Sequence, residues 1–189
     1  MNSATKTLLY CCYVWFFAEG MLGPLFAVFS QRIGGDVLDI SWAWATYLVS
    51  IGVLSLIVGK ISDGKAGKLG MMLAGFTLNT LFTFGYLLVR TPFQLLLIQT
   101  GIGLANALAY PTWDALYGEH AGRKRDGYTW GLSDGGNHIA TGIGILIGGF
   151  IVSAFSFRAL FFTMGVLQAL GTVIAFQLLT VLPRKRAQR

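Results

Sequence analysis

The stretch GKISDGKAGKL, residues 59–69, lies between two long apolar runs and decides how the rest of the chain is interpreted. Its first eight residues match the phosphate-loop pattern G-x-x-x-x-G-K-[ST] except at the last position, where Ala66 has no hydroxyl for a magnesium ion. A phosphate loop also follows a strand, whereas both flanking runs, roughly 41–59 and 69–89, are long enough for membrane-spanning helices. The stretch therefore predicts a tight turn between two spans and argues against a nucleotide site.

The composition supports a membrane environment. Of the 189 residues, 54% are hydrophobic and 12% are charged, whereas an ordinary soluble domain is about 25% charged. So few charges cannot cover the surface of a soluble globule. The adjacent Cys11 and Cys12 are expected to be small buried residues and not a disulfide. No metal-ligand spacing and no nucleophile motif is present, so we expect no enzyme, no metal and no cofactor.

Six apolar runs, each about 20 residues or longer, are long enough to cross the hydrocarbon core as helices. Lipid cannot satisfy backbone polar groups, and the runs do not alternate as barrel strands do, so helices are expected. The predicted fold class is an all-α membrane protein with six transmembrane helices. We expect residues 1–189 to form a single six-helix transmembrane domain with spans at roughly 7–30, 41–59, 69–89, 93–117, 128–153 and 159–182.

Positive charge is distributed unequally between the two sides of the predicted bundle. Of the 14 lysines and arginines, only Arg32, Arg90 and Arg158 fall on one side. The positive-inside rule therefore predicts a multi-pass protein of the cell (inner) membrane with both termini in the cytoplasm. Because the basic residues are scattered over three loops and a tail, the expected partner is the lipid bilayer and not nucleic acid.

A weak internal repeat suggests how the spans are related. SIGVLSLIVGKIS in the second span resembles TGIGILIGGFIVS in the fifth, and a proline in the first span is placed like one in the fourth. The matched glycines are Gly52, Gly59, Gly142 and Gly149. Because each copy has three spans, an odd number, the second copy is inverted relative to the first. The sequence thus predicts a 3+3 inverted-repeat bundle, which is typical of transporters.

The turn between the second and third spans resembles a family signature. Gly59-x-Ile61-Ser62-Asp63, followed by Gly67-Lys68, is similar to the G-x-L-A-D-R-x-G-R-R loop of the major facilitator superfamily, with one extra residue near Gly64. EHAGRKRDGYTWGL, which contains Glu119 and Arg125, resembles the acidic residue, basic cluster and Arg-x-Gly that follow the fourth span in that family. The resemblance implies an inner gate formed by Gly59, Asp63, Gly67, Lys68, Glu119 and Arg125.

A third similarity lies in the fifth span, where GIGILIGG, residues 142–149, is similar to the glycine motif of the antiporter subgroup. Ile145 stands in place of the motif's proline, and Leu97 stands where the family usually has an arginine in the fourth span. Together the three motifs cover the whole chain. They match an N-terminal half, since members of this family normally have twelve spans.

The resemblance implies two six-span bundles related by an axis along the membrane normal, with the solute between them. A parallel homodimer with its two-fold axis along the membrane normal would supply the second bundle. The expected function is secondary active transport of a small organic solute by alternating access, with proton coupling as an option. The alternatives are a non-transporting membrane scaffold or subunit, or the N-terminal half of a twelve-span transporter.

Acidic residues inside the predicted spans are candidates for proton coupling. An aspartate at a helix centre costs about 2.5–3.5 kcal/mol on insertion scales, so such groups are not expected to face lipid as ions. Glu19, near the middle of the first span, is either a cavity or proton site or a buried structural hydrogen bond. Asp134 and His138 are one turn apart and form either a proton relay or a structural pair.

The fourth span carries candidate solute contacts at helical spacing, Asn106, Tyr110 and Asp114. Asp114 is expected either to contact solute or to pair with a basic residue at 123 or 125, and Trp15 either to form a ligand wall or to pack. No lysine or arginine lies deep in a span, which favours a neutral or cationic solute. The polar stripe of the third span predicts interhelical hydrogen bonds and comprises Asn79, Thr80, Thr83 and Tyr86.

Overall fold

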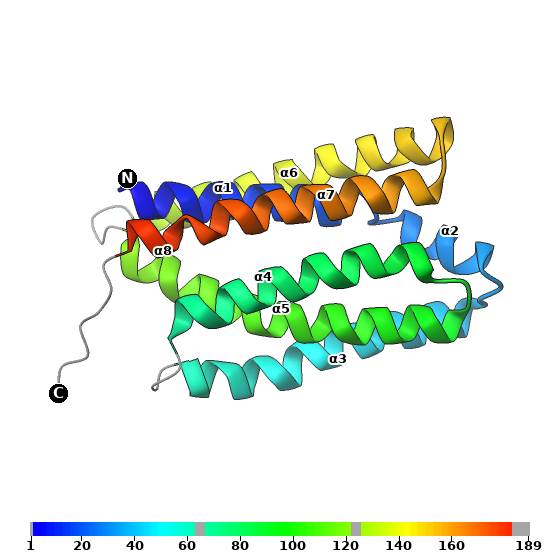
Figure 1. The fold of residues 1–189 in the computed structure, drawn as a ribbon, viewed down its shortest axis with the longest axis horizontal. Coiled ribbons are helices and arrows are strands. Elements are labelled where there is room, and N and C mark those ends of the chain that lie inside the picture. The colour runs from blue at the N-terminus through cyan, green and yellow to red at the C-terminus, as the bar shows by residue number, and fades with distance from the viewer. Residues whose placement is uncertain (1, 63–66, 122–125, 183–189) are drawn as a thin grey trace.

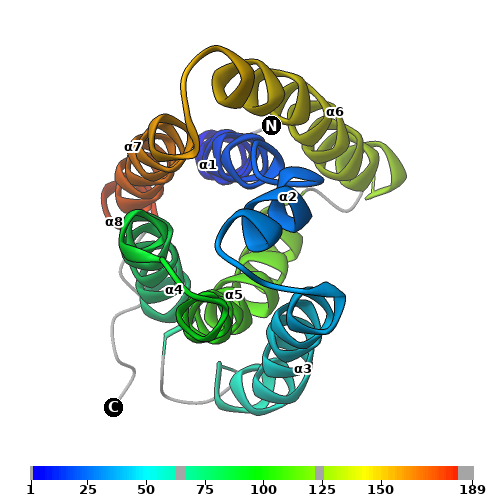
Figure 2. The same cartoon turned by 90° about the vertical axis from the view of Figure 1, so that its right-hand side faces the viewer.

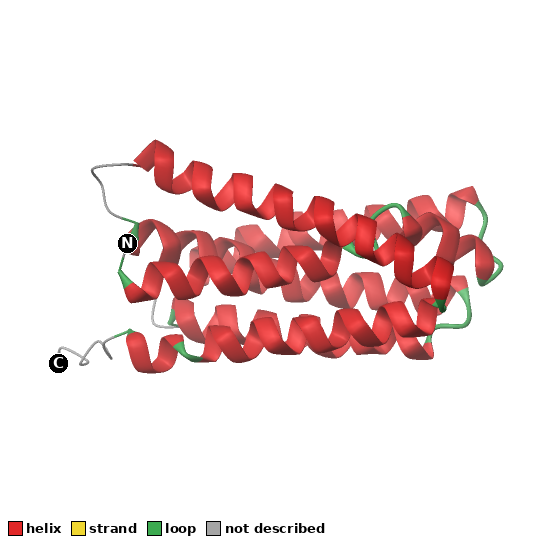
Figure 3. Ribbon diagram, turned by 90° about the horizontal axis from the view of Figure 1, so that it is seen from above, coloured by secondary structure: helices red, strands yellow, loops and turns green. Residues whose placement is uncertain are grey.

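The computed structural model describes residues 2–62, 67–121 and 126–182. Within these ranges every regular element is a helix, and the long helices follow one common direction (Figures 1 and 3), which confirms the predicted all-α class. In chain order the elements are α1 Ser3–Gly20, α2 Leu25–Arg32, α3 Val37–Ser62, α4 Lys68–Gly85, η1 Tyr86–Leu88, α5 Pro92–His120, α6 Asp126–Ala154, α7 Phe157–Phe176 and α8 Leu178–Val181.

Helices begin where the sequence supplies caps. Asn2 accepts a hydrogen bond from the Thr5 amide at 2.8 Å, and Ser156 accepts one from the Ala159 amide at 3.2 Å. At α5, the Thr91 hydroxyl caps the helix and a proline occupies the first turn, where a missing N–H costs nothing. These caps place the starts of α1, α5 and α7 at definite residues.

Five stretches in the described part of the chain are long and apolar enough to cross a membrane, and α1 with α2 makes a sixth if this bent pair is one span. The axes of α1 and α2 differ by 46°, whereas the sequence predicted one uninterrupted run. Pro24 is the physical reason, because it has no N–H to donate to the carbonyl of Gly20. The bend places Glu19 in the last turn of α1, directly before the break.

A second proline does not break its helix. Pro111 lies inside α5, which continues without interruption to His120. The hydroxyl of the neighbouring Thr112 donates to the carbonyl of Leu108 at 2.5 Å and to that of Ala109 at 3.1 Å. The carbonyl that Pro111 leaves without a helical donor is that of Ala107, so the Thr112 hydroxyl reinforces the two carbonyls that follow it in this turn.

The helices form two groups. The helix α1 packs against α6 and α7, α5 packs against α3 and α4, and contact between α4 and α7 joins the groups. Viewed along the long axis, α3 and α6 lie at the two edges of one side of the bundle, with α2 and α5 between them (Figure 2). Within the apolar 18-residue stretch of each helix, only 11% of α3 and of α6 is buried inside the protein, against 44–50% for the other three single spans. We call this the open side.

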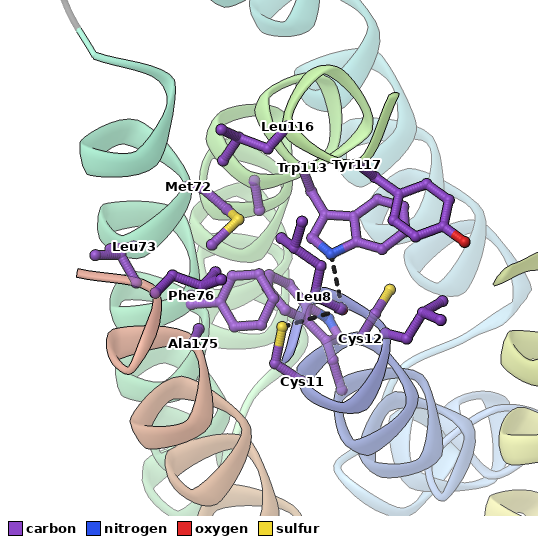
Figure 4. Packing of buried hydrophobic residues seen from close by; sticks show 14 of the residues in the cluster. Leu8, Cys11, Cys12, Met72, Leu73, Phe76, Trp113, Leu116, Tyr117 and Ala175 are labelled. Atoms are coloured by element: carbon purple, nitrogen blue, oxygen red, sulfur yellow. Dashed lines mark hydrogen bonds between the residues drawn. The ribbon is translucent and has the colours of Figure 1, made fainter. Parts of the chain in front are cut away.

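The core has two parts along the bundle. Near the start of α1, Trp113 stacks on Tyr117 with ring centroids 4.8 Å apart, and its indole nitrogen donates to the carbonyl of Leu8 at 3.1 Å (Figure 4). Cys11 and Cys12 are free and buried in this part, as predicted. At the other end, the buried rings come from α2, η1 and α7 and include Phe29, Tyr86, Phe157 and Phe161.

Several glycines allow helix backbones to approach closely. A Cβ added to Gly75 of α4 would lie 2.7 Å from the Ala105 carbonyl oxygen and 2.8 Å from the Ala109 nitrogen of α5. A Cβ at Gly144 or Gly148 of α6 would collide with the α1 backbone. Small residues at such crossings are the usual basis of packing between membrane helices.

Replacing Gly75 with leucine is therefore expected to separate α4 from α5. Overpacking of this kind costs about 1–3 kcal/mol, so Gly75→Leu should lower the thermal unfolding midpoint of the purified chain. Gly70→Leu, in the same helix, is the matched control because no heavy atom lies within 4 Å of its added Cβ. Equal midpoints for the two variants would contradict the close crossing.

Candidate functional site

Two cavities lie along α1 and α5. The larger one, about 290 Å³, is bounded by α1, α4, α5 and α6. Its polar lining includes Asp114 from α5 and Ser133, Asp134 and Asn137 from α6, so we call it the aspartate chamber. Aromatic side chains of α1, α4 and α5 form much of the remaining wall. An apolar cavity with a few convergent polar groups is the usual form of a small-molecule site.

The smaller cavity, about 100 Å³, lies farther from the start of α1 and contains Glu19. We call it the glutamate chamber. Its other polar groups come from four elements: Tyr47 of α3, Asn79 of α4, Tyr86 of η1 and Gln99 of α5. The α1–α2 break contributes two further lining residues, at positions 22 and 23.

A hydrogen-bond network lies between the two chambers. The Asn106 amide nitrogen faces three acceptors: Glu19 Oε1 at 3.3 Å, the Tyr47 hydroxyl at 3.0 Å and the Tyr110 hydroxyl at 3.1 Å. The Tyr110 hydroxyl in turn donates to Glu19 Oε2 at 3.3 Å. The amide has two hydrogens for three acceptors, so these contacts share them. The structure thus brings together Glu19, Asn106 and Tyr110, for which the sequence suggested separate roles.

Tyr47 is the member of this network that sequence reasoning missed. It lies in α3 within an apolar run, and its neighbours give no polar stripe that would set its direction. Only the crossing of α3 with α5 brings its hydroxyl to Asn106. The sole signal in the sequence is the presence of a hydroxyl inside a span, where a hydrogen-bond partner is expected.

Trp15 belongs to the wall of the aspartate chamber. Its ring is only 2% exposed and meets the Phe76 ring edge to face, with centroids 3.8 Å apart. The Tyr110 ring lies 6.1 Å away and is itself stacked on Phe16, with 4° between the ring planes. Trp15 therefore packs in the core and also lines the cavity, and its role as a ligand wall stays a prediction. Aromatic faces of this kind can bind cations.

The acidic candidates on α5 and α6 are exposed. Asp114 and Asp134 line the same chamber from different helices. His138 is also exposed, but no hydrogen bond or ion pair joins it to Asp134 in the described part of the chain. The pairing of Asp114 with Arg123 or Arg125 concerns residues outside the described ranges.

The loop motifs meet at the end of the bundle where α1 begins. Lys68, the first residue of α4, forms an ion pair with Glu119 of α5 at 2.7 Å, and Gly67 is the N-cap of α4. The hydroxyl of Thr5 donates to the carbonyl of His120 at 3.0 Å and so connects α1 to α5. A Cβ added to the first glycine of this motif, Gly59, would have no heavy atom within 4 Å, while Asp63 and Arg125 lie outside the described residues.

The polar stripe of the third span behaves in two ways. Thr80 bonds to the hydroxyl of Thr172 on α7 at 2.9 Å, and Tyr86 donates to Gln99 on α5 at 3.2 Å, so interhelical hydrogen bonding is confirmed for these two residues. Asn79 differs, because both polar atoms of its buried amide lack a hydrogen-bond partner. Over residues 2–62, 67–121 and 126–182, no group of three histidine, cysteine, aspartate or glutamate side chains is placed to hold a metal.

Comparison with known proteins shows the family to which this chain belongs. The family model of the Major Facilitator Superfamily matches residues 8–189. The chain is 24% identical over 157 residues to an uncharacterised MFS-type transporter of Methanocaldococcus jannaschii, which covers 83% of this chain and 40% of the relative. It is 25% identical to the multidrug resistance protein MdtG of Enterobacter lignolyticus and 24% identical to that of Salmonella typhimurium. Each MdtG match covers 76% of this chain, and 35% and 36% of the relatives respectively.

The matched relatives are thus longer than this chain, which aligns with 40% of their length or less. The family match covers the two loop motifs and the glycine motif of the fifth span, which confirms the resemblance seen in the sequence. It also accounts for the long apolar helices. The chain is an integral membrane protein and belongs to the major facilitator superfamily.

Proposed function

We propose that this chain is a secondary active transporter that moves a small organic solute by alternating access. The observation that carries the proposal is the pair of chambers that meet at the Glu19–Asn106–Tyr110 network. A solute site beside an acidic residue in the middle of a span is the arrangement expected for coupled transport. Relatives named as MFS-type transporters support the same class of activity.

The aspartate chamber is the proposed solute site, with Trp15, Tyr110 and Asp114 as contacts and Asn106 behind them. Its described lining has aromatic rings and carboxylates but neither lysine nor arginine. Carboxylates attract cations by charge, and aromatic faces attract them through the ring quadrupole. The proposed solute is therefore neutral or cationic, and an organic cation has the best match with these walls.

A second copy is the proposed cover of the open side. Asp114, Asp134 and His138 are exposed, and lipid is a poor cover for ionisable groups. The open glycines Gly142 and Gly149 of α6 are seven residues apart, as are Gly52 and Gly59 of α3, so each pair lies on one helix face. A two-fold axis along the membrane normal at this side would bring α3 of one protomer against α6 of its partner.

The pairing of helices supports an inverted repeat within this six-span domain. Span one (α1) packs against spans five and six (α6 and α7), while span four (α5) packs against spans two and three (α3 and α4). If three is added to or subtracted from each span number, the contacts of span one with spans five and six become those of span four with spans two and three. The contact between α4 and α7 converts into itself. The 3+3 arrangement is therefore part of the proposal.

The gate is proposed at the end where α1 begins, with both termini in the cytoplasm. The Lys68–Glu119 ion pair lies there, together with Gly67 at the start of α4 and Gly59 near the end of α3. Asp63 and Arg125, the other proposed gate residues, fall outside the described ranges. The two paired side chains are 23% and 44% exposed. Exposed ion pairs contribute about 0.2–1 kcal/mol, which suits a contact that must break in every transport cycle.

A longer transporter is the second candidate, favoured by the 35–40% of the relatives' length that the chain matches. In that case the cover of α3 and α6 would be a second six-span bundle in the same polypeptide. The solute chamber and the gate would keep the same roles. The oligomeric state of the 189-residue chain in a lipid-like environment separates the two candidates.

The homodimer makes a prediction about two neighbouring glycines of α6. An added Cβ at Gly142 meets no heavy atom within 4 Å, whereas one at Gly144 collides with the α1 backbone. We expect Gly142→Leu to fold but to lose the dimer, and Gly144→Leu to be destabilised as a monomer. Native mass spectrometry in mild detergent gives the oligomeric state, and thermal unfolding gives the fold. A strictly monomeric native chain, or a Gly142→Leu variant that dimerises normally, would contradict the proposed interface.

Proton coupling through Glu19, with Asp134 and His138 as further candidates, makes a second prediction. In proteoliposomes that contain the native chain, a pH gradient should drive uptake of ethidium, a fluorescent organic cation. Glu19→Gln keeps the hydrogen-bonding shape but cannot exchange a proton, so gradient-driven accumulation should fall about tenfold or more. Ethidium exchange without a gradient should persist. Asp39→Asn, at a half-buried acid in the first turn of α3 and away from both chambers, is the control. Unchanged accumulation in Glu19→Gln would remove its proton role.

A further inference from the structure

The side chains around Glu19 include buried polar atoms that lack partners. Asn79 is 1% exposed, and neither its amide nitrogen nor its amide oxygen has a hydrogen-bond partner. Asn106 is fully buried, and its Oδ1 is unpaired although its nitrogen belongs to the network. The indole nitrogen of Trp15 is also unpaired. An unsatisfied buried group costs about 1–3 kcal/mol, so a cluster of them indicates a binding site for a polar ligand.

The electrostatics of this cluster favour a cation. Glu19 lies in the last turn of α1, and the carbonyl end of a helix carries roughly half a negative charge. Pro24 leaves the Gly20 carbonyl without a helical donor at the same place. Among the described residues that line the glutamate chamber, none is a lysine or an arginine. Interrupted membrane helices commonly coordinate small cations at such ends.

The oxygen atoms around Glu19 suit a metal cation when the carboxyl group has released its proton, so sodium and the proton would compete for this site. A proton on Glu19 would make one hydrogen bond and so leave at least one of the amide oxygens of Asn79 and Asn106 without a partner. A hard cation binds several oxygens at once and prefers carboxylate, amide carbonyl and water. Asn79 can direct its oxygen to such an ion and its nitrogen to the carboxylate. One carboxylate together with the neutral amide of Asn79 carries a single negative charge, which matches a monovalent ion.

We propose that the glutamate chamber is a sodium site, in which the Glu19 carboxylate and the amide oxygen of Asn79, both in its lining, are ligands, while Asn106 positions the carboxylate through its amide nitrogen. The cavity of about 100 Å³ exceeds the roughly 10–15 Å³ that one water needs, so waters have room to complete the coordination shell. The site depends on neither the identity of the solute nor the presence of a second copy. Through Asn106 and Tyr110, the ion would also stiffen one wall of the aspartate chamber.

Thermal unfolding of the purified chain in detergent tests the site. Sodium chloride should raise the unfolding midpoint with saturation, because a ligand that binds only the folded state stabilises it. Choline chloride at the same ionic strength and pH should not. Asn79→Leu should weaken the apparent sodium affinity about tenfold or more. Gln168→Leu is the matched control, because Gln168 is also a buried amide with an unpaired nitrogen but does not line the chamber.

Equilibrium binding of radioactive sodium to the native chain is the second measurement, with about one ion per chain expected, and it does not depend on a variant that folds. An equal rise of the midpoint in choline chloride, or a normal sodium response in Asn79→Leu, would overturn the proposal. A response to pH but not to sodium would also overturn it and leave Glu19 as a proton site. Neither measurement uses transport, so a chain that binds sodium but moves no solute would refute the proposed function alone.

Discussion

Polar groups inside lipid must find their partners within the protein, and the arrangement around Glu19 depends on this constraint. The carboxyl group lies in the last turn of α1 and is reached by donors from α5, while α3 contributes Tyr47 to the same network. These contacts hold together the two groups of helices that pack around α1 and α5. The need of these buried polar groups for hydrogen-bond partners therefore accounts both for the network around Glu19 and for the way the helices cross there.

Pro24 determines where that network can form. With Pro24 in the chain, α1 ends at Gly20, so the acid lies beside the Gly20 carbonyl, which has no helical donor, and not within an unbroken helix. Pro111 has the corresponding place in span four, but the hydroxyl of Thr112 bonds to the preceding carbonyls and α5 continues. The internal repeat thus has a chemical difference at its centre. One copy has a break between Gly20 and Pro24, and the other has a continuous helix that presents Asn106 and Tyr110.

The sequence was sufficient for the fold class and the family, because apolar runs of spanning length and the loop motifs are local features. It also selected Lys68 and Glu119 from separate motifs, and the structure pairs them. The meeting of Glu19 with Asn106 could not be predicted, because residue spacing gives the face of a helix but not its rotation in the bundle. For the same reason Tyr47 was missed. Hydropathy also hid the break after Gly20, since Met21 and Leu22 continue the apolar run.

The length of α3 has a consequence for the membrane around it. Its 26 residues extend about 39 Å at ~1.5 Å per residue, whereas the hydrocarbon core is about 30 Å thick. Such a helix must tilt or reach into the headgroups. Because α3 packs on α5 and makes little contact with the other helices, α5 is the main support that opposes a change in its inclination. Bilayer thickness therefore sets how far this edge of the bundle leans, and thin and thick membranes will hold the same polypeptide in different shapes.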